Sequence, residues 1–152
     1  MTTAASVSAS TRPPAALRRR RALVVAGATL AATAVWLVAQ ATGTDLEVTV
    51  AGQPPMVVSL PLVVVTALAA ALAGWGALAI LQRVTSRGRT LWTGLAVAAL
   101  LMSFGPVATV ETNAAVRTSL ALMHVAVAAV LVPGLRGTVP ARGSADPERR
   151  QS

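Results

Sequence analysis

Four long apolar stretches, separated by short polar segments, dominate the pattern of this chain. A helix of about 20 residues spans about 30 Å, the thickness of the hydrocarbon core of a bilayer. Each stretch has that length and carries almost no charge. We therefore predict an all-α integral membrane protein that is a bundle of four transmembrane helices. The predicted helices cover residues 22–41, 60–82, 91–110 and 115–135.

The polar segment between the first two helices has a different period. Apolar and polar residues alternate over 46–50 (LEVTV), which is the pattern of a strand. Residues 51–55 (AGQPP) have turn chemistry, and residues 56–58 return as a second apolar run. We predict a short β-hairpin within residues 44–58. It must rest on the helix ends or on a partner, because an isolated hairpin is marginally stable in water.

Helix-breaking residues and composition predict the remaining boundaries of the helices and of the transmembrane domain. Pro133-Gly134 is predicted to end the fourth helix, and Thr112 or Asn113 to cap its start. Outside the transmembrane domain of residues 22–135, the chain is small, polar and proline-containing, which predicts disorder. The two disordered tails are a basic one, residues 1–21, and a second one, residues 136–152.

The charges predict an orientation. All 13 basic residues are arginine, and a four-pass arrangement puts 12 on one side and only Arg117 on the other. Positively charged loops stay in the cytoplasm, so we expect a multi-pass protein of the bacterial plasma membrane with both termini cytoplasmic. Trp36 and Trp92 lie near helix ends and are predicted to anchor in the interfaces. A cleaved signal peptide competes for the first helix, but its apolar run exceeds the usual length of about 7–15 residues.

Several function classes are excluded or disfavoured. The chain has no cysteine, which excludes disulfides and thiolate metal sites. The arginines flank apolar segments rather than forming a basic face with aromatic residues, so nucleic acid is not an expected partner. Phosphate loops, metal-ligand clusters and nucleophile motifs are missing from the sequence. We expect no enzyme, no catalytic residue, no metal and no cofactor.

His124 is the first candidate for function, because it lies near the middle of the fourth helix. Ionisable groups at that depth are costly and suggest a functional site. The structural alternative is a hydrogen bond between helices, to a group such as Ser103 or Thr66. Arg117 lies seven residues earlier on the same face and either lines a polar vestibule or turns to the interface to pair with Glu111.

Two further sets of residues are candidates. Trp75 stands between Gly74 and Gly76, where small residues allow helices to approach closely, so it serves packing or a ligand pocket. A run of arginines directly before the first helix determines topology and is placed to contact anionic lipid headgroups. The run consists of Arg18, Arg19, Arg20 and Arg21.

Several motifs together resemble those of a known family. They are residues 72–76 (LAGWG) running into 81–83 (LQR), 89–93 (RTLWT), 122–125 (LMHV) and 132–135 (VPGL). The chain is similar, over roughly residues 20–136, to a family of small actinobacterial four-pass membrane proteins catalogued as domain of unknown function 6069. The resemblance implies four helices and an outer β-like loop. It implies no activity and no functional residues.

Two hypotheses of function follow. In the first, the protein is a non-enzymatic membrane or envelope component, an accessory subunit or scaffold that uses the lipid bilayer, the outer hairpin 44–58 or a second copy as partner. In the second, it is a small oligomeric transporter or channel with a polar path near His124. The break at Gly105-Pro106 in the third helix favours the second hypothesis, because broken helices mark substrate paths.

Overall fold

A computed structural model describes residues 14–138, which form four helices and one two-stranded sheet. In chain order the elements are α1 (Pro14–Ala41), β1 (Glu47–Val48), β2 (Met56–Val57), α2 (Leu60–Val84), α3 (Gly88–Thr109) and α4 (Ala114–Arg136). All four helices are long and apolar enough to cross a membrane. The predicted multi-pass helical bundle is thus confirmed. The disorder predicted for residues 1–13 and 139–152 concerns parts of the chain outside the described residues.

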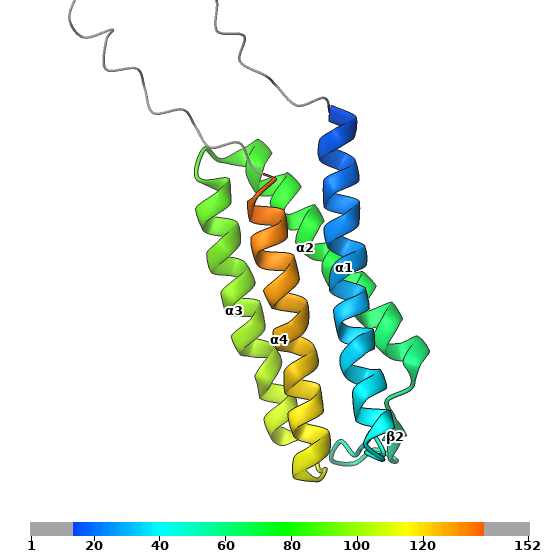
Figure 1. Cartoon of the computed structure of the whole chain (residues 1–152). Helices are drawn as coiled ribbons and strands as arrows, with labels where there is room; N and C mark the ends of the chain where they lie inside the picture. The colour runs from blue at the N-terminus through cyan, green and yellow to red at the C-terminus, as the bar shows by residue number, and fades with distance from the viewer. Residues whose placement is uncertain (1–13, 139–152) are drawn as a thin grey trace, which may run out of the picture.

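The helix bundle is packed unevenly (Figure 1). α1 and α4 lie side by side and form the largest interface, whereas α2 crosses obliquely and touches α4 only slightly. We call the end that carries residues 18–21, the α2–α3 connection and Arg136 the arginine-rich end. The opposite end, which carries residues 42–59 and 110–113, is the hairpin end.

The start of α1 differs from the prediction. Disorder was expected up to residue 21, but α1 begins at Pro14. Alanine and arginine are strong helix formers, and two of the arginines also find partners at the end of α4. Arg20 Nη1 donates to the Gly137 carbonyl at 2.8 Å, and Arg21 Nε donates to Thr138 Oγ1 at 3.1 Å. These contacts favour the helical conformation beyond the apolar stretch.

The end of α4 also differs. Pro133-Gly134 does not end the helix, which continues to Arg136. Gly134 instead lies against α1, where an added Cβ would be 2.6 Å from Cγ1 of Val24. The missing side chain at Gly134 is therefore what allows α1 and α4 to approach closely. At the other end of α4, the cap is Asn113, one of the two predicted residues, and it accepts a hydrogen bond from Val116 N–H at 2.9 Å.

The predicted hairpin is confirmed as an antiparallel sheet in which Glu47 pairs with Val57 and Val48 with Met56. Three hydrogen-bonded contacts hold it on the helix ends. Trp36 Nε1 of α1 donates to the Val58 carbonyl at 2.8 Å. The other two contacts come from the α3–α4 connection: Thr112 Oγ1 donates to the Glu47 carbonyl at 2.9 Å, and Thr49 forms a bridge with Glu111. The hairpin thus has the support that two short strands require.

We predict that Gly134→Ala lowers the free energy of unfolding by about 1–3 kcal/mol, the usual cost of overpacking. Val24 is β-branched, so its methyl groups cannot easily turn away from the new Cβ. The matched control is Gly76→Ala, because a Cβ at Gly76 would meet nothing within 4 Å. That change is expected to be neutral or to stabilise by up to about 1 kcal/mol. Equilibrium unfolding in one detergent compares the two, and equal effects would contradict the close contact.

Candidate functional site

A cavity of about 820 Å³ lies between α2, α3 and α4, and we call it the groove. Along α2 its lining runs from Leu62 to Ala77, which is about 22 Å of helix. Lining residues such as Ala73 of α2 and Ala99 of α3 are exposed on the surface. The groove therefore opens sideways between α2 and α3, at the depth where a bilayer presents its acyl chains.

Four polar side chains from α2, α3 and α4 contribute to the lining. They are Thr66 on α2, Trp92 and Ser103 on α3, and His124 on α4. The rest of the lining is apolar and much of it is alanine. Such a surface binds hydrocarbon and offers few groups for recognition of a polar solute.

His124 faces this groove and forms its hydrogen bond within its own helix. Nδ1 lies 2.7 Å from the Leu120 carbonyl oxygen. The ring also lies beside Phe104, with the ring centroids 6.3 Å apart. The structural alternative from the sequence, a bond between helices, is therefore wrong. The proposed partners do lie in the same groove, but Ser103 Oγ donates to Leu100 O at 2.6 Å and Thr66 Oγ1 to Leu62 O at 2.7 Å.

Arg117 and Glu111 lie at the hairpin end, away from the groove lining. Arg117 Nη2 donates to the backbone carbonyl of Val110 at 3.2 Å. Glu111 contributes through its backbone, which exchanges two hydrogen bonds with Thr49 at 2.9 and 3.1 Å. Among the described residues, the arginine therefore caps the end of α3 rather than forming a vestibule above His124.

The tryptophans of α2 and α3 differ in their contacts. Trp92 is only 2% exposed and its Nε1 donates to the Gly74 carbonyl at 2.8 Å, so its indole packs between helices rather than on the outer surface of the bundle. Its indole forms part of the groove lining towards the arginine-rich end. Trp75 is half-buried, packs against the buried cluster around Leu78 and lies outside the groove lining. The helix pair α2–α3 is thus joined by the tryptophan that sequence reasoning placed at the surface.

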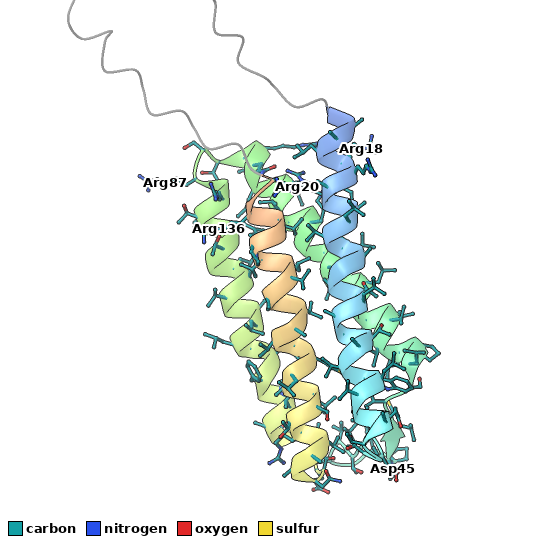
Figure 2. All side chains as sticks on the ribbon, in the orientation of Figure 1. Arg18, Arg20, Asp45, Arg87 and Arg136 are labelled. Atoms are coloured by element: carbon teal, nitrogen blue, oxygen red, sulfur yellow. The ribbon has the colours of Figure 1, made fainter. Side chains whose placement is uncertain are left out.

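The arginine-rich end gathers the charge of the bundle (Figure 2). Arg18, Arg20, Arg87 and Arg136 lie there, whereas Asp45 lies at the hairpin end. Arg18 and Arg19 are exposed. Arg21 is half-buried and its Nη2 donates to Gln82 Oε1 of α2 at 3.0 Å. Two of the four arginines before the apolar stretch therefore join helices, and two point to the surroundings.

The groove has few side chains that could bind a metal ion or transfer a proton. Within residues 14–138, no three His, Cys, Asp or Glu side chains lie close enough together to hold a metal ion. What the groove combines is a long apolar surface and one imidazole at mid-depth. That arrangement can hold hydrocarbon and orient a single polar group.

Comparison with known proteins adds one match. The model of a family of unknown function, DUF6069, matches residues 12–141 of the chain. No curated protein and no solved structure gives a match.

Proposed function

The chain belongs to the family of unknown function DUF6069, and from that premise we propose that it is a non-enzymatic component of the bacterial cell membrane that binds another protein through its outer hairpin. Its role would be that of an accessory subunit or scaffold. The family description assigns no activity, so the support comes from the chain's own geometry. The observation that carries the proposal is an open strand edge on a hairpin that is otherwise braced.

The two edges of the hairpin are not equivalent. Beyond β1, Thr49 is bridged to Glu111, which covers that side. On the other side, Val58 N–H donates to the Leu46 carbonyl at 2.7 Å, so the N–H of Val58 points towards β1. In an antiparallel ladder, the next pair then directs its backbone groups outwards. The N–H and C=O of Val57 therefore point away from β1, towards any strand added there.

The side chains at this edge are also suited to a partner. Met56 is 50% exposed and Val57 is 62% exposed. Strand addition uses backbone hydrogen bonds for affinity and apolar contacts for specificity. Because α1 and the α3–α4 connection hold the hairpin in place, a partner would not have to order it on binding. That reduces the entropic cost of association.

The orientation follows from the same arrangement of charges. The arginine-rich end would face the cytoplasm and the hairpin end would face the outside, because positively charged segments stay in the cytoplasm during membrane insertion. The extensive packing of α1 on α4 supports a first helix that stays in the bundle rather than being removed as a signal peptide. Both termini would then be cytoplasmic.

The alternative, a small transporter or channel, has less support. Transport paths are usually lined by several polar groups at mid-depth. Here the two hydroxyl groups of the groove and His124 Nδ1 are all bonded to backbone carbonyls of their own helices. Arg117 is directed to the end of α3. The groove opens towards lipid, which favours hydrocarbon over a solute in water.

Orientation is tested with single cysteines, because the chain has none of its own. We expect Gln53→Cys in the hairpin to react with a membrane-impermeant maleimide in intact cells. Ser86→Cys, in the α2–α3 connection, is expected to react only after the membrane is permeabilised. Both positions are exposed, so accessibility from the two sides of the membrane is what differs. The reverse labelling pattern would contradict the orientation.

The docking edge is tested with a photo-reactive residue at Met56 in cells. We expect an adduct with a second protein, and its yield is expected to fall about tenfold in Val57→Lys, which corresponds to about 1.4 kcal/mol. A lysine on an edge strand opposes strand addition. Gln53→Lys adds the same charge at the exposed turn and is expected to leave the yield unchanged.

Two results would contradict the docking proposal. An adduct that forms equally in Val57→Lys would show that the strand edge is not the contact. An adduct with the mass of two copies of this chain would replace the partner protein with a homo-oligomer.

A further inference from the structure

The hydrogen bond of His124 determines which ring nitrogen carries a proton. A carbonyl oxygen can only accept, so Nδ1, at 2.7 Å from Leu120 O, must be the donor. In the neutral ring, Nε2 is then an unprotonated acceptor. His124 lies ten residues after the start of α4, about 15 Å along the helix and so within the hydrocarbon core. An acceptor without a donor at this depth costs free energy.

The groove itself supplies no donor to Nε2. The hydroxyls of Thr66 and Ser103 already donate to Leu62 O and Leu100 O. The indole N–H of Trp92 donates to Gly74 O. These are the donor-bearing side chains of the lining other than His124. Because the hydrocarbon core of the bilayer offers no water, a molecule that enters the groove from the bilayer can supply this donor.

The shape of the groove restricts that molecule. The lining extends from Met56 and Val58 at the hairpin end to Val132 towards the arginine-rich end. Much of the wall consists of alanine, so the space is long, apolar and open to the acyl-chain region. A flexible hydrocarbon chain fits such a space. An ordinary phospholipid acyl chain has no hydrogen-bond donor at mid-depth and would leave Nε2 unpaired.

We propose that the groove binds a long-chain alcohol or phenol whose hydrocarbon part lies against α2 and α3 and whose hydroxyl donates to Nε2 of His124. The ligand enters sideways from the bilayer between α2 and α3. The proposal does not rest on the docking edge on β2, because a different observation carries it; the two surfaces share only the residue Met56.

The single histidine makes the test specific. Protein labelled with ¹⁵N-histidine, in phosphatidylcholine nanodiscs, gives ring signals from His124 alone. The probes are 1-hexadecanol and its methyl ether, which keeps the chain and loses the donor. We expect the signals of the Nδ1–H tautomer before addition, and a saturable upfield shift of Nε2 with the alcohol only. The alcohol is expected to bind at least about tenfold more tightly than the ether.

A pair of variants locates the binding. Ala99→Phe fills the mouth of the groove and is expected to abolish the shift. Leu101→Phe is the control, since Leu101 is on the same helix, 65% exposed and outside the lining. An alcohol-induced shift that survives in Ala99→Phe would overturn the assignment to the groove.

The unmodified protein tests the proposal without either variant. No saturable shift with the alcohol, equal shifts with alcohol and ether, or an unprotonated Nδ1 would each overturn it.

Discussion

The absence of water in the hydrocarbon core is the constraint on which the rest of this structure depends. Every polar group at that depth has to find its partner within the chain. The helices satisfy their backbones internally, and their hydroxyl side chains donate to carbonyls three or four residues earlier. Thr29, Thr33 and Ser119 all do so. Strand edges and loops are confined to the two ends of the bundle. His124 follows the same rule with one nitrogen and departs from it with the other.

Uneven helix packing creates the groove. Gly134 brings α4 against Val24 of α1, and these two helices form the largest interface. α2 is held to α3 near the arginine-rich end by the Trp92–Gly74 hydrogen bond. At the hairpin end, α2 follows the loop that Trp36 ties to α1. α2 is therefore bonded to α1 at both of its ends and to α3 through Gly74, whereas it touches α4 only slightly, and the space it leaves along α4 is the groove.

The sequence was sufficient for the features that depend on local pattern. Hydropathy predicted four helices, alternation predicted the hairpin, and residue type predicted the Asn113 cap, because each of these is set within one segment. Three other features depend on which helix lies opposite: the start of α1, the role of Gly134 and the burial of Trp92. In the sequence, a glycine after a proline indicates a helix end. In the structure, Val24 of α1 occupies the space beside Gly134, so the glycine serves helix packing instead.

In the candidate site, too, some features follow from the local sequence and others depend on neighbouring helices. Depth alone identified His124, since a buried ionisable residue is unusual wherever it occurs. The groove has no comparable signal, because alanine on a groove wall and alanine facing lipid look alike in sequence. Likewise, Ser103 and Thr66 line the same groove as His124 but are not its hydrogen-bond partners, since each hydroxyl donates to a carbonyl of its own helix.

Met56 links the two surfaces that the structure offers. It belongs to β2, whose outer edge is open, and it also lines the hairpin end of the groove. A protein added along β2 would contact Met56 and cover that end, whereas the sideways opening between α2 and α3 would stay accessible from the bilayer. Met56 and Val58, the other residue of the hairpin region in the lining, are therefore the side chains through which a protein partner and a bound alcohol would influence each other directly. Thermodynamic linkage makes such coupling reciprocal. If a bound ligand repositioned Met56 and so changed the affinity for the partner protein, the partner would change the affinity for the ligand by the same factor.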